Sequence, residues 1–251
     1  MSRGQRRSAD EVYVDRTIAS RAGIPDDPRP GNYVVIDVTH FSTTVVELFH
    51  AGASCVYVPE ERGLEHEFAE REPAARVGGG SGPDYTAPEG YDFFNSPSSV
   101  QSVDVAGRPT ALTSSNGGAA VTDLRTRGGP DVDVYVASLS NARRVAAHLD
   151  ALDDDRPVIT VAAGSKGKPS PEDTVGGVLV QRYLAGDEPT AAELDLYREV
   201  VTAGKAAKYS RKAEIRSRDL LEFATAVDTR TAVPKLDGQR LVDVADAEPD
   251  G

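Results

Sequence analysis

Short runs of β-branched and aromatic residues recur along the chain, and most are followed by a stretch in which apolar residues have helical spacing. The first clear case is residues 33–36, which precede Val45, Leu48 and Phe49 at the spacing of one helix face. Because these runs lack strict alternation of apolar and polar residues, they predict strands that are buried on both faces. The same pattern pairs strands at 55–58, 109–113, 132–136 and 158–162 with helices at 61–70, 118–127, 141–149 and 172–184, and a further strand at 74–77 leads into the glycine-rich residues 78–82.

This alternation predicts an α/β fold with a largely parallel or mixed sheet that is covered by helices on both faces. Residues 190–227 predict a mostly helical C-terminal portion, and residues 231–244 predict one more strand. We expect an N-terminal extension and linker at 1–32 and an α/β domain at 33–244, built as one unit or as two packed lobes. The last residues, 245–251, predict an acidic tail.

Composition and charge narrow the classes of protein that fit. Of the 251 residues, 39% are hydrophobic, which is enough for a full core, and the single Cys55 cannot form an internal disulfide. No apolar run reaches the roughly 18 to 20 residues that span a bilayer, and the polar N-terminus lacks a signal-peptide pattern. We therefore expect a cytoplasmic protein that does not enter membranes.

The formal net charge of -12 disfavours nucleic acids as partners, because the surface and the phosphate backbone would repel each other. The acidic residues are scattered along the whole chain, a distribution that predicts adaptation to high salt in a halophilic organism rather than one binding patch. The four His residues and Cys55 have no zinc-ligand spacing, so a zinc or thiol enzyme is disfavoured.

The loop after the strand at 33–36 carries the first candidate chemistry. Asp37 follows the strand directly, and Ser42 and Thr43 lie at the start of the next helix, where free N–H groups suit an oxyanion. The structural alternative is a helix cap beside a solvated Asp. His40 lies in the same loop, where it is a candidate general acid or anion contact, or a solvated loop residue.

Two later loops repeat this arrangement of small polar residues before a helix. Ser115, Asn116 and Gly117 follow the strand at 109–113, and they suit either close backbone approach to a ligand or an ordinary tight turn. Asn95 precedes Ser96, which together with a following proline has the signature of a helix cap.

Glu172 and Asp173 open the helix that follows the strand at 158–162. Acidic residues at this position stabilise the helix dipole without any ligand. They are also hard oxygen donors beyond a strand end, and together with Asp37 they predict a Mg²⁺ site made of carboxylates and water. The two roles are compatible with each other.

Taken in order, these loops resemble the 2-phosphosulfolactate phosphatase (ComB-like) family, which comprises Mg²⁺-dependent phosphatases of coenzyme M biosynthesis. The resemblance covers residues 33–184, with a weaker echo at 228–234. The family pattern Ile-Asp-Val-x-Arg-Ala-Thr/Ser-Thr/Ser corresponds to residues 36–43, and Gly-Phe-Asp-x-x-Asn-Ser-Pro corresponds to residues 90–97. Further correspondences are the Gly-Gly-Glu-Arg-Gly loop at 78–82, Thr-Thr-Asn-Gly at 114–117, and the stretches 138–143, 163–165 and 172–173.

The departures from this pattern concern charged residues. His40 stands where the family has Arg, and Gly80 and Ser81 stand where it has Glu-Arg. Arginine grips oxyanions with paired hydrogen bonds, and losing one charged partner costs about 1.5 to 3 kcal/mol. The candidate replacements are Lys166, Lys168 and Arg143. Alternatively, the ligand carries less charge, or catalysis has been lost.

The resemblance implies Mg²⁺-dependent hydrolysis of a small anionic phosphate monoester by a homodimer. The implied catalytic residues are Asp37, His40 and Asp173, and the implied metal ligands are Asp37, Glu172 and Asp173. The implied substrate-binding residues are Ser42, Thr43, Asn95, Ser96, Ser115, Asn116, Gly117, Asn141, Ser165 and Lys166. One alternative is a non-catalytic or reassigned member that binds a small anion or a partner protein, and another is a lyase or transferase acting on a carboxylate metabolite.

Overall fold

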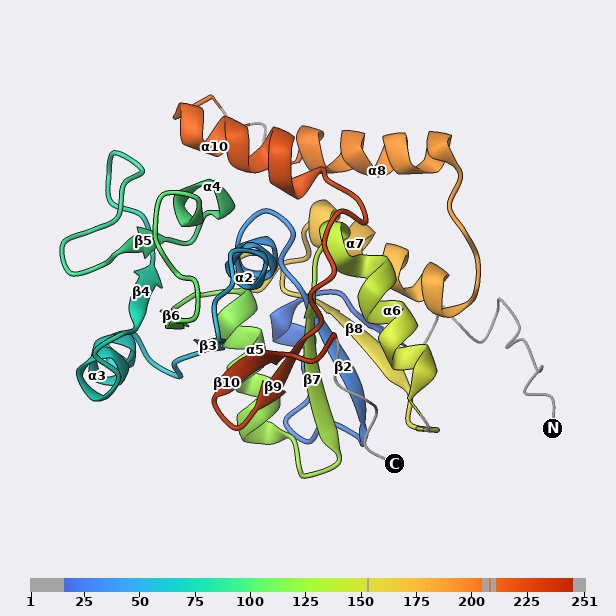
Figure 1. The fold of residues 1–251 in the computed structure, drawn as a ribbon. Coiled ribbons are helices and arrows are strands. Elements are labelled where there is room, and N and C mark those ends of the chain that lie inside the picture. Colours follow the sequence, from blue (N-terminus) through green and yellow to red (C-terminus); the bar gives the residue numbers. More distant parts are fainter. Residues whose placement is uncertain (1–15, 153, 205–207, 209–210, 246–251) are drawn as a thin grey trace.

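A computed structural model describes residues 16–152, 154–204, 208 and 211–245. Its centre is one mixed sheet in which ten strands have the order β1-β8-β2-β7-β9-β10-β3-β6-β4-β5. Figure 1 shows helices on both faces of the larger half of this sheet. The predicted fold class is therefore confirmed.

The sheet consists of two parallel blocks. The first contains β1 (Thr17–Ile18), β8 (Val158–Ala162), β2 (Gly31–Ile36) and β7 (Val132–Ala137). The second contains β3 (Cys55–Tyr57), β6 (Pro109–Leu112), β4 (Arg76–Gly79) and β5 (Phe93–Phe94).

An antiparallel hairpin, β9 (Pro234–Asp237) and β10 (Arg240–Asp243), joins the two blocks. Because β9 is antiparallel to β7 and β10 is antiparallel to β3, the two blocks run in opposite directions. The sequence predicted one strand in this region and the structure forms two. Gly238, with φ of 57°, opens the two-residue turn between them.

Successive residues of β2 enter two different core clusters, and different helices contribute to each cluster. Val35 belongs to a core cluster with Val45 of α2 (Phe41–His50) and Leu124 of α5 (Gly117–Arg127). Val34 belongs to the opposite cluster, whose members include Val145 of α6 (Ala142–Ala151) and Leu179 of α7 (Pro171–Leu184). A strand whose alternate residues enter two cores is buried on both faces, as the unbroken apolar run predicted.

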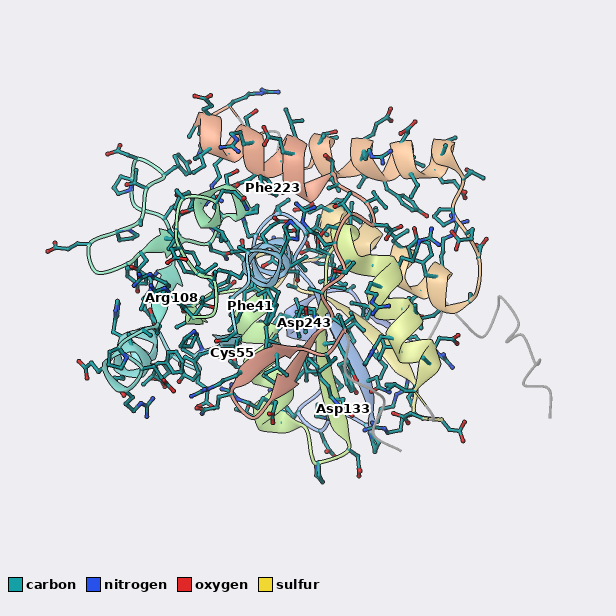
Figure 2. The ribbon with its side chains drawn as sticks, in the orientation of Figure 1. Phe41, Cys55, Arg108, Asp133, Phe223 and Asp243 are labelled. Carbon is teal, nitrogen blue, oxygen red and sulfur yellow. The ribbon has the colours of Figure 1, made fainter. Side chains whose placement is uncertain are left out.

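The C-terminal portion forms a further layer over the ends of α2 and α7 (Figure 1). It contains α8 (Ala191–Ala203), α10 (Glu214–Arg218) and a π-helix, η3 (Asp219–Ala224). The shorter elements are η1 (Arg21–Gly23), α3 (Leu64–Arg71), α4 (Pro97–Val100) and η2 (Leu139–Asn141). Figure 2 shows Phe41, the first residue of α2, in the interior between α2 and the central strands.

The described residues of the predicted N-terminal extension take part in the sheet. Thr17 and Ile18 pair with β8, and the guanidinium of Arg21 donates to both carboxylate oxygens of Asp123, at 2.6 and 3.0 Å. Residues 1–15 of the extension and 246–251 of the predicted acidic tail lie outside the described residues. The domain boundaries stay predictions.

Within the described part of the chain, no helix has the length and apolar character needed to cross a bilayer.

Candidate active site

The carboxylate of Asp37 lies where the N-termini of two helices meet. Asp37 follows β2 and is only 4% exposed. Its Oδ2 accepts a hydrogen bond of 3.1 Å from the backbone N–H of Gly117, at the start of α5. Backbone N–H groups of His40 and Phe41, at the start of α2, also lower the pKa of this carboxylate. The positive ends of two helix dipoles therefore point at one buried acidic group.

Gly117 makes this approach sterically feasible. A Cβ atom at position 117 would lie 2.6 Å from Cδ1 of Phe41 and 2.9 Å from Cβ of Asp37. Both distances are too short for carbon atoms in contact. A glycine at this position thus lets the backbone of α5 reach the Asp37 carboxylate.

The carboxylate of Asp173 ties the loop after β2 to the loop after β8. Its Oδ1 accepts from the backbone N–H of Val38 at 2.9 Å. Its Oδ2 accepts from the N–H of Gly164 at 2.9 Å and from the hydroxyl of Ser170 at 2.8 Å. Both oxygens of Asp173 are therefore engaged in contacts that hold the loops together.

Glu172 differs from its neighbour because part of its carboxylate has no partner. The side chain is 3% exposed, and Oε2 is buried with no hydrogen bond among the described residues. This oxygen faces Gly204 at the end of α8, where a Cβ atom would lie 2.9 Å from it. A buried, unpaired carboxylate oxygen is costly unless a proton or a cation meets it.

Burial and neighbouring negative charge raise the pKa values of Asp37 and Asp173. Burial, followed by the negative charge of Glu172, raises the pKa of Asp37 to about 6, although the Gly117 and Phe41 amides oppose the shift. Burial, followed by the charge of Asp37, raises the pKa of Asp173 well above its ordinary value. Repulsion of this kind would be relieved by a bound cation.

The carboxylates around Asp37 suit Mg²⁺ better than a cation that takes all of its ligands from the protein. In the described part of the chain, no group of three or more His, Cys, Asp or Glu residues is arranged to hold a metal ion. Mg²⁺ keeps several waters and is commonly bound by one or two carboxylates together with substrate phosphate. Asp37 and Glu172 meet that requirement, whereas both oxygens of Asp173 are already engaged.

His40, the N-cap of α2, contacts a guanidinium that the sequence motifs did not reveal. Nη1 of Arg216, in α10, donates to Nδ1 of His40 at 3.2 Å. Because a guanidinium only donates, Nδ1 of His40 accepts and its proton resides on Nε2. Burial, followed by the positive charge of Arg216, lowers the pKa of His40 to about 3, so the ring is neutral near pH 7.

Arg216 is itself held by several groups. It forms a buried ion pair with Asp219, in which Nη1 and Oδ2 are 3.1 Å apart, and it also donates to the backbone oxygen of Asn95 at 3.2 Å. Its guanidinium carbon lies 4.9 Å from the ring centre of Phe94 and 5.6 Å from that of Tyr85. Arg216 thus joins the loops after β2, β4 and β5.

Sequence reasoning missed Arg216 because it lies in a helix that carries no motif. The available signal was two opposite charges, Arg216 and Asp219, three residues apart beside the apolar residues of 220–224. A charged pair at this spacing is most often solvated, and only the fold shows that this one is buried.

Asn95 and Ser96 lie beside this ion pair. The N–H of Asn95 donates to the oxygen of Gly79 at 2.6 Å, and its side-chain Oδ1 is buried without a partner among the described residues. The hydroxyl of Ser96 donates to Oδ1 of Asp219 at 2.7 Å and caps α4 by accepting from the N–H of Ser99.

Other predicted substrate-binding residues have mainly internal contacts. The hydroxyl of Ser42 accepts from the N–H of Asp37 at 2.8 Å, and that of Thr43 donates to the oxygen of Val38. The side-chain amide of Asn141 bonds to Ser138, Val136 and Ala232, which places it outside the carboxylate group.

The remaining predicted residues lie in the surrounding loops. Ser115 is exposed and Asn116 is the N-cap of α5, next to Gly117. Ser165 begins a tight turn that it closes with Lys168, and Lys166 is exposed at its tip. No contact in the structure tests the substrate-binding roles, which stay predictions.

The family pattern has arginines that this sequence lacks, and the structure shows which other arginines lie near those positions. Arg143, one candidate replacement, forms ion pairs with Glu188 and Asp228 away from the carboxylate group. Arg62 instead reaches the glycine-rich loop, where its Nη2 is 2.7 Å from the position that a Cβ of Gly80 would take. Arg62 and Arg216 therefore bring positive charge near the loops that lack the expected arginines.

The chain is similar in sequence to known phosphatases. A family model described as 2-phosphosulpholactate phosphatase matches residues 19–239. A probable 2-phosphosulfolactate phosphatase of Thermotoga petrophila is 28% identical over 211 residues, covering 81% of this chain and 88% of the relative. Probable 2-phosphosulfolactate phosphatases of Deinococcus radiodurans and Synechococcus sp. are 29% and 33% identical, covering 85% and 71% of this chain and 90% and 75% of the relatives.

Proposed function

The chain belongs to the 2-phosphosulpholactate phosphatase family, and from this premise we propose that it hydrolyses a small anionic phosphate monoester with Mg²⁺ as cofactor. The observation that carries the proposal is that the buried carboxylate of Asp37, at the N-termini of α2 and α5, lies near enough to Glu172 to feel its charge and is joined through the backbone of Val38 to Asp173. These carboxylates suit a divalent cation, and the helix N-termini suit a phosphoryl group. 2-Phosphosulfolactate, which the names of the relatives specify, is the first substrate to test.

Asp37 and Glu172 would hold the ion, because each has a buried carboxylate and Glu172 has an oxygen without a partner among the described residues. When bound, Mg²⁺ would neutralise charge on the phosphoryl group and lower the pKa of water. Asp173 would act as a positioning residue, since its oxygens fix the backbone of Val38 and Gly164.

The backbone of the helix N-termini would orient the phosphoryl oxygens beside these carboxylates, and such fixed donors act on charge as it develops. In the reaction, water adds to phosphorus, the ester P–O bond breaks, and the alcohol and inorganic phosphate leave. His40, neutral with its proton on Nε2, would donate a hydrogen bond rather than exchange a proton.

Phosphate release tests this proposal. Purified protein at high salt would be assayed with 2-phosphosulfolactate and with other small phosphate monoesters, with Mg²⁺ and with EDTA. We expect Mg²⁺-dependent release that falls by at least ~100-fold in Asp37→Asn. Asp150→Asn changes an exposed carboxylate of α6 and serves as the matched control.

Two results would contradict the proposal. Full turnover in EDTA would remove the role of the metal, and full turnover by Asp37→Asn would remove the role of that carboxylate. Binding of inorganic phosphate without any turnover would instead support the alternative of a non-catalytic member that binds a small anion. A homodimer and a cytoplasmic location stay predictions from the sequence.

A further inference from the structure

Two neighbouring hydroxyl groups in the first turn of α2 are enclosed by the protein. Ser42 and Thr43 are both 0% exposed. Each hydroxyl forms hydrogen bonds to backbone atoms in or beside the loop after β2. Because no part of either residue is accessible, the two hydroxyls can affect a bound ligand only through the groups that they hold.

Ser42 holds the backbone on the N-terminal side of Asp37. Its hydroxyl oxygen accepts a hydrogen bond of 2.8 Å from the backbone N–H of Asp37. The same hydroxyl donates to the carbonyl oxygen of Val35, in β2, at 3.2 Å. The peptide group that leads into Asp37 is therefore fixed against the end of the strand.

Thr43 holds the backbone on the C-terminal side of Asp37. Its hydroxyl donates to the carbonyl oxygen of Val38 at 2.5 Å, and the N–H of Val38 donates to Oδ1 of Asp173 at 2.9 Å. Both peptide groups of Val38 are thus engaged, and the first of them contains the carbonyl of Asp37. Since peptide groups are planar, these contacts and the contact from Ser42 restrict rotation of the Asp37 backbone.

Ser138, in the loop after β7, determines the direction of the Thr43 hydroxyl. The two hydroxyl oxygens are 2.8 Å apart. Thr43 has one hydroxyl proton and gives it to Val38, so Ser138 donates to Thr43. Ser138 is itself buried, and its oxygen accepts from the N–H of Ser140 at 3.4 Å. Hydrogen bonds in a buried chain of this kind strengthen one another.

We infer that Thr43, supported by Ser42 and Ser138, is a positioning residue that fixes the direction of the Asp37 carboxylate. Its effect on turnover rests on the proposed function, in which Asp37 holds the metal ion. Thr43 touches neither substrate nor metal in this role. A displacement of about 1 Å at a reacting group can cost ~100-fold in rate, so a hydroxyl that prevents such a displacement has a measurable effect.

The test compares Thr43→Val, which keeps the shape of the side chain without its hydroxyl, with Thr43→Ser, which keeps the hydroxyl. Thr110→Val is the matched control, because Thr110 is also 0% exposed and donates to a backbone oxygen, that of Cys55 in β3, at 2.9 Å. One measurement is kcat and KM for phosphate release from 2-phosphosulfolactate at saturating Mg²⁺. The other is hydrogen exchange, by NMR, of the Gly117 amide, which donates to Asp37.

We expect Thr43→Val to lower kcat about 10-fold to 100-fold and to leave KM within ~2-fold of wild type, because it disturbs Asp37 rather than a substrate contact. Thr43→Ser should keep kcat within ~3-fold of wild type. The Gly117 amide should exchange at least ~10-fold faster in Thr43→Val, while the amide of Val180 in α7 keeps its wild-type rate. Thr110→Val should match wild type in all of these quantities.

Ser138→Ala provides a second variant if Thr43→Val does not fold. It removes the donor to the Thr43 hydroxyl, so kcat should fall and exchange of the Gly117 amide should rise, each by a smaller factor. Where Thr43→Val does fold, adding Ser138→Ala to it should cause no further loss, since Ser138 acts through Thr43. Unchanged kcat and exchange in Ser138→Ala would overturn the assignment.

Unchanged exchange of the Gly117 amide in Thr43→Val would also overturn it, as would equal losses in Thr43→Val and Thr43→Ser. Faster exchange of all amides alike would show a purely structural role, and a rise in KM alone would show a substrate contact, so either result contradicts the assignment. Failure of the proposed function is distinct, since wild type would then release no phosphate while the exchange comparison still decides whether Thr43 fixes Asp37.

Discussion

The backbone N–H of Gly117 donates to Oδ2 of Asp37 across 3.1 Å and so joins two loops that are 80 positions apart in the chain. Each residue contributes something that the other requires. Asp37 accepts a hydrogen bond from the first N–H of α5. Gly117 has no side chain, so the start of α5 can come this close to Asp37. The arrangement makes Gly117 a sensitive position for both stability and activity.

Gly117→Ala should lower the free energy of unfolding by about 1 to 3 kcal/mol, because its Cβ would overlap Phe41 and push α5 away from Asp37. Thermal or urea unfolding measures the loss, and phosphate release should fall as well. Gly129→Ala is the control, since nothing lies within 4 Å of a Cβ at that position. Unchanged stability of Gly117→Ala would show that the close approach to Phe41 does not exist.

Mg²⁺ should raise the melting temperature of wild type but not that of Glu172→Gln. At a Mg²⁺ concentration 100 times the Kd, binding stabilises the folded state by about 2.7 kcal/mol. Glu172→Gln removes the buried carboxylate whose Oε2 has no partner among the described residues, so the metal-free variant should be at least as stable as wild type. Glu70→Gln, in the exposed part of α3, should behave like wild type. A full Mg²⁺ shift in Glu172→Gln would exclude Glu172 as a ligand.

Stability should rise with pH between about 3 and 6.5 because of His40. The pKa of His40 is lowered to about 3 in the folded protein, so the unfolded chain binds more protons in this interval and acid favours unfolding. The contribution is fully present above the unfolded pKa and is lost as pH falls through the interval. His40→Gln should flatten this part of the stability profile, whereas His50→Gln, at an exposed position, should not. Identical profiles for wild type and His40→Gln would contradict the assignment.

Asp219→Asn should destabilise the protein by about 3 to 5 kcal/mol, because it leaves the charge of Arg216 buried without its partner. It also weakens the acceptor for Ser96 and Ser98. Glu222→Gln breaks the exposed ion pair with Arg218, for which a loss of less than about 1 kcal/mol is expected. Chemical denaturation of both variants gives the comparison, and similar losses would mean that the Arg216 pair is not buried.

Much of the first parallel block could be predicted from the sequence, because its strands are long and apolar on both faces. The strand predicted at 158–162 is β8, and the helix predicted at 172–184 is α7 with one more residue at its start. The elements that escaped prediction are short or depend on distant partners. β1 and β5 have two residues each, too few to show any periodicity.

The candidate site was partly predictable for a related reason. Asp37, Asn116 and Asp173 follow strand ends, where parallel sheets gather ligand-binding loops, and the fold brings these loops together. Arg216 and Arg62 could not be predicted, because neither lies in a loop that carries one of the motifs. Their proximity to the site depends on how the C-terminal helices and the loop before α3 pack, which no local pattern encodes.

The hairpin between the two parallel blocks has a consequence for how the protein is made. Residues 234–243 are synthesised after the other described strands, yet they occupy the middle of the sheet, between β7 and β3. Until they emerge, each half has an open edge at β7 or β3, and such edges invite pairing with other chains. The sheet is therefore completed only after both parallel blocks have been synthesised, and a chain cut short before Pro234 would keep both edges exposed.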